Sequence, residues 1–383
     1  MNMDKAILQD VQVDLDYLTS LLHQLVDIPS PSGYTDSVVH FVGQELQRLD
    51  IPFEITRRGA IRAVLSGKNE APGRGLVAHL DTLGAMVKTL KPNGRLAIVP
   101  IGTWSARFAE GARVTIFTHD GDICRGTILP LKASGHTFDK DVDTQPVGWE
   151  NVEVRVDEFC DTEHQLLEHG LRVGDYIAID PGFELLDNGF INSRFLDNNA
   201  GVACVLAAAR AIKNAGVELD LTCYLLFTIF EEVGSGASSV LHGDIAEMVS
   251  VDNSTVAPGQ QSIEEGITIC MMDSSGPFDY HLTRRLIALC EEKGLKYSRD
   301  VFKYYRCDAA SAVEAGNDIR TALVCYGVDA SHGYERTHQF SLFELTRLLT
   351  YYVQGHSIVQ RDRYDLGPMK GFPTQPIPEI PGG

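Results

Sequence analysis

Long apolar runs are missing from this sequence. The longest, around Leu225 to Phe230, has the length of a buried strand and falls well short of the roughly 18 residues that a membrane span needs. Residues 1–10 are charged and contain no apolar stretch, so we expect no secretory signal. These absences predict a cytoplasmic protein with no membrane partner.

Paired cysteines and positive charge are also scarce. The eight cysteines are scattered, form no CxxC pair and often lie within apolar runs, which predicts buried free thiols in a reducing compartment. Lysine and arginine number 33 against 52 aspartates and glutamates, giving a formal net charge of −19. This acidity disfavours nucleic acid as a partner and is compatible with a substrate that carries a free amino group.

The first part of the chain has the pattern of an α/β fold. Apolar residues recur at helical spacing over residues 13–28 and 35–49, and Ser30-Pro31-Ser32-Gly33 separates the two stretches. Residues 60–65 and 75–80 have the pattern of strands. Helices alternating with strands indicate the start of an α/β sheet.

The character of the sequence changes between residues 86 and 182. Short strand patterns at 96–99, 114–117, 123–129 and 176–180 are joined by turns such as Asn93-Gly94 and residues 119–122. Short strands joined by tight turns predict a small all-β unit inserted into the α/β domain.

The α/β pattern resumes after the insertion. We expect helices at 199–213, 280–293 and 341–353, with strands at 221–230, 247–252, 267–271 and 319–326. The fold class is therefore predicted as a three-layer α/β/α domain with an inserted small β-barrel-like domain. The predicted domains are residues 1–86 plus 183–365 for catalysis, 87–182 for the insertion, and a Pro- and Gly-rich tail at 366–383 that is disordered or draped.

Two of the predicted strands end in residues that suggest metal chemistry. His79 ends one strand, and alternation along an extended segment puts Asp81 on the same side, where its carboxylate can orient the imidazole. Glu231 and Glu232 end the most apolar strand. Adjacent carboxylates that emerge from a buried strand need a compensating cation, and opposite orientations would let one bind metal while the other reaches a water molecule.

Three further residues complete a candidate set. Asp197 precedes a predicted helix, Asp252 ends a strand, and His332 follows another strand by a short loop. Each alone is typical of a cap or an exposed loop, but together the five candidates fall at five strand ends on one sheet edge. Two imidazoles and three carboxylates suit Zn²⁺, with Co²⁺ or Mn²⁺ as alternatives, and their charge balances two divalent ions sharing a hydroxide. Glu231 would then act as the general base.

These motifs together resemble the M42 family of metallo-aminopeptidases, related to the M20, M28 and M18 peptidases. The matching pieces are Ser30-Pro31-Ser32-Gly33, Ala78-His79-Leu80-Asp81, Leu196-Asp197-Asn198, Glu231-Glu232-Val233-Gly234, Val251-Asp252 and Ser331-His332. The resemblance implies that His79, Asp252, His332 and Glu232 complete two metal sites bridged by Asp197, that Asp81 supports His79, and that the peptide bond after Asp197 is cis. It also implies removal of N-terminal residues from short peptides, and homo-oligomers, often dodecamers, formed through the insertion.

Two departures from the family pattern leave alternatives open. The family has Asp-Asp-Arg where this chain has Asp197-Asn198-Asn199, and an Arg-Tyr pair where it has Asp329-Ala330. An amidase or deacylase acting on a small peptide-like metabolite is therefore a second hypothesis, and a scaffold that has lost its metal is a third. His338 is an alternative to His332 as the last ligand. A neighbouring subunit's copy of His136 is a further candidate, since related peptidases can share a histidine in this way.

Overall fold

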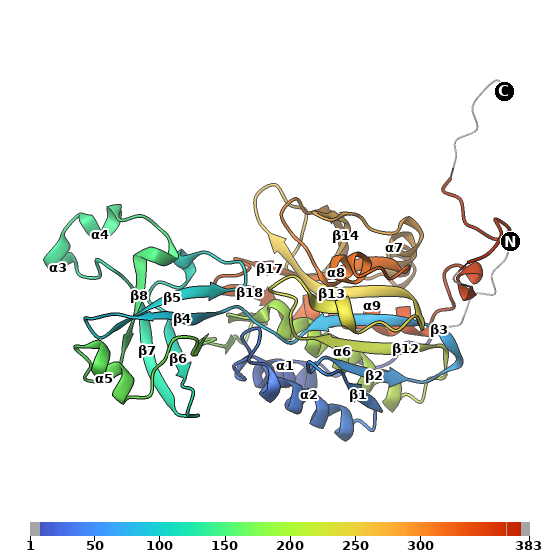
Figure 1. The fold of residues 1–383 in the computed structure, drawn as a ribbon. Helices are drawn as coiled ribbons and strands as arrows, with labels where there is room; N and C mark the ends of the chain where they lie inside the picture. Colours follow the sequence, from blue (N-terminus) through green and yellow to red (C-terminus); the bar gives the residue numbers. More distant parts are fainter. Residues whose placement is uncertain (1–7, 365, 377–383) are drawn as a thin grey trace.

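The computed structural model describes residues 8–364 and 366–376, and its largest element is a twelve-stranded mixed sheet (Figure 1). Four parallel strands form its centre: β12 (Leu219–Thr228), β3 (Gly67–His79), β13 (Ile245–Val256) and β17 (Arg320–Asp329). β12 and β13 are buried along most of their length, as expected for central parallel strands covered on both faces.

Shorter strands extend the sheet on both sides. Beside β12 lie β2 (Ile61–Leu65) and β1 (Phe53–Ile55), both antiparallel. Beyond β17 come β18 (Glu335–His338), β11 (Phe190–Ser193) and β10 (Glu184–Leu185). β17 also pairs with β14 (Ile267–Asp273), which joins β15 (Gly276–Pro277) and β16 (Tyr297–Val301).

The longer helices pack against this sheet and against one another. They are α1 (Leu15–Val26), α2 (Asp36–Arg48), α6 (Leu196–Asn214), α7 (Tyr280–Lys293), α8 (Asp308–Glu314) and α9 (Gln339–Gln354). α6 and α9 contact each other and the central strands, whereas α8 contacts the same strands and the short helix η3 (Gly236–Ser239). Along α6, alanine and valine are buried on nearly every side, which lets the helix lie close to the sheet.

A closed barrel of six antiparallel pairings interrupts the α/β part. Its order is β4 (Gly84–Leu90), β5 (Arg95–Ile101), β8 (Val152–Val156), β7 (Ile123–Pro130), β6 (Arg113–Phe117) and β9 (Tyr176–Ile179). Figure 1 shows it as a separate lobe with α3 (Gly135–Phe138), α4 (Asp141–Thr144) and α5 (Glu163–Glu168) at its outer end. Inward side chains form a second apolar core, distinct from that of the sheet.

The predicted mixed α/β fold with a small barrel is confirmed, with some boundaries moved. β12 ends at Thr228, so Glu231 and Glu232 lie in the following turn. β13 continues to Val256 because β17 pairs with it as far as Asp329, so Asp252 lies inside the strand rather than at its end.

The segment after α9 is partly described. Short helix η4 (Gln360–Arg363) is followed by residues that fold back on it: the Arg361 guanidinium donates to the carbonyls of Gly367 and Pro368 at 2.8 and 3.1 Å. The rest of the predicted tail, residues 377–383, lies outside the described residues. Within the described part of the chain, no helix has the length and apolar character that a membrane crossing requires.

Candidate metal centre

His79 is the last residue of β3, where the central strands end on the side of the sheet that faces the barrel. The chain passes from it through Asp81 into β4, and the imidazole is 1% exposed. Its Nδ1 lies 2.9 Å from the backbone carbonyl oxygen of Asp81, whereas the Asp81 carboxylate is 3.7 Å away. Because a carbonyl can only accept, Nδ1 carries the proton and Nε2 is left free as a ligand.

The Asp81 carboxylate has a different main contact from the expected one. Its two oxygens accept the backbone N–H groups of Glu231 and Glu232 at 3.1 and 3.2 Å, and the Ser32 hydroxyl donates to it at 2.5 Å. Asp81 therefore holds the Glu231–Glu232 turn directly, and supports His79 through its backbone.

Asp197 lies between the two histidines. Its Oδ1 is 3.1 Å from Nε2 of His79, and its Oδ2 is 3.2 Å from Nε2 of His332. It stands at the start of α6, where the Asp197–Asn198 peptide bond is cis, as the family resemblance implies. One carboxylate thus faces two imidazoles from different parts of the chain, which is the arrangement expected of a bridging ligand.

Glu231 and Glu232 divide between the two histidines. Glu231 Oε2 lies 3.8 Å from Nε2 of His79, and Glu232 Oε2 lies 3.7 Å from Nε2 of His332. Glu232 is 8% exposed, and its other oxygen, Oε1, has no hydrogen-bond partner among the described residues. The two adjacent carboxylates therefore point to different halves of the cluster, although the chain here forms a turn and not a strand.

His332, not His338, joins this cluster. His332 has a φ of 64° in the turn between β17 and β18, and its Nδ1 lies 2.8 Å from the carbonyl oxygen of Thr103. His338 instead caps α9 through the Phe340 N–H, and its Nε2 lies 3.0 Å from the Asn188 carbonyl oxygen. His136 lies in α3, at the outer end of the barrel (Figure 1).

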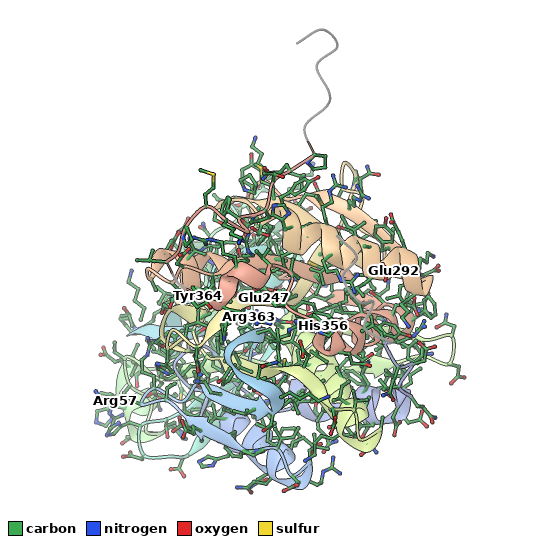
Figure 2. All side chains as sticks on the ribbon, turned by 90° about the vertical axis from the view of Figure 1, so that its right-hand side faces the viewer. Arg57, Glu247, Glu292, His356, Arg363 and Tyr364 are labelled. Atoms are coloured by element: carbon green, nitrogen blue, oxygen red, sulfur yellow. The ribbon has the colours of Figure 1, made fainter. Side chains whose placement is uncertain are left out.

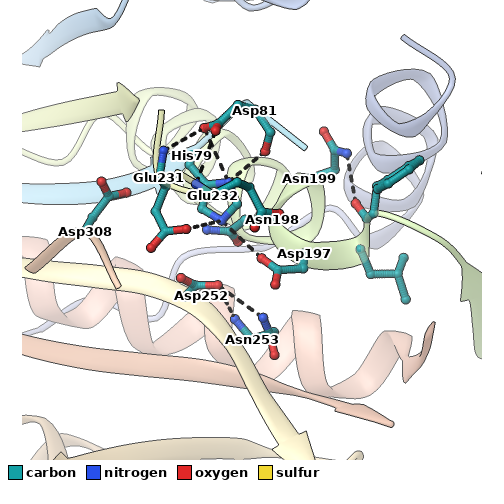
Figure 3. Close-up of polar contacts among 12 residues, drawn as sticks. His79, Asp81, Asp197, Asn198, Asn199, Glu231, Glu232, Asp252, Asn253 and Asp308 are labelled. Atoms are coloured by element: carbon teal, nitrogen blue, oxygen red, sulfur yellow. Dashed lines mark hydrogen bonds and ion pairs between the residues drawn. The ribbon is translucent and has the colours of Figure 1, made fainter. Parts of the chain in front are cut away.

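Asp252 approaches the cluster from β13. It is 4% exposed and accepts the backbone N–H of Asn253 at 2.7 Å. Figure 3 shows it beside Asp197 and below His79. Burial, followed by the nearby Asp197 carboxylate, raises the pKa of Asp252 well above its usual value.

The remaining pKa shifts show how closely opposite charges are packed. Burial alone would lower the pKa of His79, but the carboxylates of Asp197 and Glu231 raise it well above its usual value. Burial likewise opposes protonation of His332, and Asp197 and Glu232 raise its pKa to about 11. Burial raises the pKa of Glu232 to about 8 and also raises that of Glu231. Clustered buried carboxylates of this kind favour a nearby cation.

The candidate residues open into a cavity of about 1010 Å³. A smaller cavity, of about 540 Å³, lies at the opposite end of the central strands. Asp197, Glu231, Glu232, Asp252 and His332 all line the larger cavity. Its other walls include the barrel loop at Gly102 and Thr103 and residues 302–306. The site is therefore accessible to a small ligand, and His79 lies buried beneath it.

Two buried carboxyl groups were missed by the sequence analysis. Glu335 accepts the backbone N–H groups of Asp197 and His332 at 3.1 and 2.9 Å, so it positions both, and burial raises its pKa to about 8. Asp308, at the start of α8, accepts the Thr228 hydroxyl at 3.0 Å. For Asp308 the available signal was an acidic residue beside apolar ones, in Cys307-Asp308-Ala309, whereas the sequence around Glu335 contains no such signal.

Asn198 and Asn199, which prompted the alternative hypotheses, point into the protein. The Asn198 side chain donates to the Val251 carbonyl at 2.8 Å and accepts from the Tyr326 hydroxyl at 3.1 Å. Asn199 donates to the Phe195 carbonyl at 2.9 Å. An aspartate at position 198 could not donate to Val251, so the asparagine fits this chain's own contacts beside Asp252.

Comparisons with known proteins agree with the family resemblance found in the sequence. The profile of the M42 glutamyl aminopeptidase family matches residues 59–348. YhfE of Bacillus subtilis (strain 168), provisionally named an aminopeptidase, is 38% identical over 334 residues, which cover 87% of this chain and 96% of that protein.

Solved structures share the fold at lower identity. A TET aminopeptidase from a marine sediment Thaumarchaeota archaeon superposes with a TM-score of 0.81 at 19% identity, covering 88% of this chain and 96% of that one. The TET1 peptidase of Pyrococcus horikoshii, which can assemble into a tetrahedron or a large octahedral shell, has a TM-score of 0.78 at 20% identity, covering 88% and 99%.

Proposed function

The chain belongs to the M42 aminopeptidase family, and on this basis we propose that it is a dinuclear metallo-aminopeptidase that removes N-terminal residues from short peptides. The observation that carries the proposal is the position of Asp197. Its two carboxylate oxygens face Nε2 of His79 and Nε2 of His332 at 3.1 and 3.2 Å. A carboxylate placed between two imidazoles is the ligand that a pair of ions would share.

The donor set fits two divalent ions. One ligand atom from each of His79, Asp197 and Glu232 lies within 4.8 Å of the others, and Glu232 keeps an unpaired buried oxygen. We assign His79 and Asp252 to one ion and His332 and Glu232 to the other, with Asp197 shared. Mixed imidazole and carboxylate ligands favour Zn²⁺, and Co²⁺ or Mn²⁺ are alternatives.

The protein's own contribution centres on Glu231. Ions bound here would make water nucleophilic near neutral pH and polarise the scissile carbonyl. Glu231 takes a proton at its carboxylate and delivers it to the leaving amine, since its backbone is fixed by Asp81 and its side chain lines the cavity. The raised pKa of Glu231, caused first by burial, suits a group that must hold a proton during the reaction.

The inward orientation of Asn198 and Asn199 weakens the two alternatives. These residues prompted the amidase or deacylase hypothesis, yet neither lines the cavity and both make hydrogen bonds within the fold. A scaffold without metal would have no need to retain two histidines and four carboxylates, most of them buried, beside an open cavity. Peptide hydrolysis therefore remains the better supported function.

We further propose that the chain acts in the cytoplasm as a homo-oligomer, up to a dodecamer, assembled through the barrel insertion at residues 87–182. All eight cysteines are unpaired and seven are buried, which suits a reducing compartment. The large assemblies of the Pyrococcus horikoshii TET1 peptidase support the oligomer. Neither a nucleic acid nor a membrane is a proposed partner.

Substitution of Glu231 tests the chemistry. We expect Glu231→Gln to retain about two ions per chain by elemental analysis, because Glu231 is not an assigned ligand, and to lose about 10²- to 10⁴-fold in kcat on aminoacyl substrates. Glu54→Gln, on the exposed edge strand β1, is the matched control and should keep full activity. Full activity of Glu231→Gln, or of protein stripped by a chelator, would contradict the proposal.

A further inference from the structure

The barrel reaches the candidate metal centre through the loop of residues 102–104. The Thr103 carbonyl accepts the Nδ1 proton of His332 at 2.8 Å. Gly102, with a φ of 81°, packs against Glu232: a Cβ placed there would lie 3.5 Å from the Glu232 Cβ and 2.5 Å from the Leu83 side chain. Both residues assigned to one ion, His332 and Glu232, thus touch a loop that belongs to the barrel.

The Thr103 contact also decides which nitrogen of His332 faces the cluster. A carbonyl oxygen can only accept, so Nδ1 must carry the proton and Nε2 is the free ligand atom toward Asp197. His332 lies in a turn with a positive φ, where Glu335 holds its backbone N–H and the Thr103 carbonyl holds its imidazole. The position of the Thr103 carbonyl therefore matters for the direction of the imidazole.

The chain contains two tryptophans, and both hold this loop. The Trp104 indole N–H donates to the Gly84 carbonyl, at the start of β4, at 3.1 Å. The Trp149 indole N–H donates to the Trp104 carbonyl, also at 3.1 Å. The two rings meet edge to face, with centroids 4.8 Å apart. Both hydrogen bonds thus hold Trp104, the residue that follows the Thr103 carbonyl in the chain.

We propose that Trp104 and Trp149 are positioning residues that, through the Thr103 carbonyl, keep His332 directed at the metal centre. Trp149 begins the short helix η2 (Trp149–Asn151), at the end of the long excursion from the barrel that carries α3 and α4. The segment that carries Trp149 is distant in sequence from His332, yet it thereby positions this proposed metal ligand. The inference rests on the proposed function, because it concerns how the proposed metal centre is held ready.

Zinc binding to the metal-free full-length protein tests this inference. Trp149→Phe keeps an aromatic ring but removes the hydrogen bond to the Trp104 carbonyl. We expect it to weaken Zn²⁺ binding by about tenfold or more in isothermal titration calorimetry, as loss of a residue that orients a metal ligand does. Thr118→Val is the matched control, since it removes partly buried hydrogen bonds with Asp122 in the same barrel, away from the loop, and should bind Zn²⁺ like the wild type.

A His332→Ala background separates positioning from general damage. There we expect Trp149→Phe to cause no further loss of Zn²⁺ affinity, because the residue it orients is gone. The inference is overturned if the loss persists in that background, or if Trp149→Phe binds Zn²⁺ as the wild type does. A wild-type protein that binds no Zn²⁺, Co²⁺ or Mn²⁺ would instead contradict the proposed function.

Discussion

Asp308 is a buried carboxyl group close to Glu231, and its burial outweighs the contacts that would stabilise its charge. It is 3% exposed, one oxygen accepts the Thr228 hydroxyl, and the other, Oδ1, has no hydrogen-bond partner among the described residues. Figure 3 shows it on the far side of Glu231 from Asp197. Burial raises the pKa of Asp308 to about 6, from an ordinary value of 3.8.

This raised pKa predicts a pH-dependent stability. The folded state disfavours ionised Asp308, so the unfavourable contribution grows as the pH rises from about 4 to about 6 and is constant above. For metal-free protein we expect Asp308→Asn to be more stable than the wild type at pH 8, by about 1–3 kcal/mol, and to show little gain near pH 4. Urea unfolding at both pH values measures it. The exposed Asp187→Asn serves as control, and an equal gain at both pH values would refute the explanation.

The residues of the site were predictable to different degrees. His79, Glu231 and Glu232 could be found because acidic or imidazole groups follow strongly apolar strands. Asp197 and Asp252 gain meaning only from their neighbours, which sequence alone does not reveal. Glu335 was missed because its partners are the backbone N–H groups of Asp197 and His332, and such contacts leave no pattern in the sequence.

At the level of elements, Arg74 joins β3 to β13 and to the end of α9. Its guanidinium is fully buried, lies 3.1 Å from the Glu247 carboxylate and donates to the carbonyls of Tyr352 and His356. Figure 2 shows Glu247 and His356 on the face of the molecule away from the barrel. The two strands and the helix thus meet at one buried ion pair, at the end of the central strands opposite the candidate site.

Removing one partner of this pair should cost more than removing both. Arg74→Met leaves Glu247, 3% exposed, without its cation, and we expect a loss of about 3–5 kcal/mol in the free energy of unfolding. The double variant with Glu247→Met should recover part of that loss, because no uncompensated charge remains. Chemical denaturation of both variants and the wild type measures the difference. A double variant less stable than Arg74→Met would contradict this account.

Helices whose sequence has both an apolar periodicity and capping residues at its two ends were predicted closely. The helix expected at 280–293 is α7, where the Asp279 side chain caps the first turn and Gly294, with a φ of 64°, ends the last. Short elements that depend on distant partners were missed, among them β16, which pairs with β14, and α8. The extent of β13 was also misjudged, because pairing with β17 and not local sequence sets its end.

At the scale of the whole molecule, the barrel and the sheet have separate cores but share the candidate site. The two hairpins at β4–β5 and β6–β7 were visible as turn signals, whereas closure needs β8 and β9, whose partners are far away in sequence. The barrel spans Gly84 to Ile179, close to the predicted insertion at 87–182. Whether the insertion acts as an independent assembly domain stays a prediction.

The distribution of the candidate ligands predicts how metal affects overall stability. His79, Asp197, Glu232, Asp252 and His332 come from five separate segments of the α/β part, and unfolding would scatter them. Ions that bind only the folded state stabilise it by about 2.7 kcal/mol per site at a hundredfold excess over Kd. We therefore expect a chelator to lower Tm by several degrees in differential scanning calorimetry, and added Zn²⁺ to restore it. In His79→Ala the chelator should have a smaller effect, since one ion loses a ligand; an equal drop in both proteins would place the stabilising metal elsewhere.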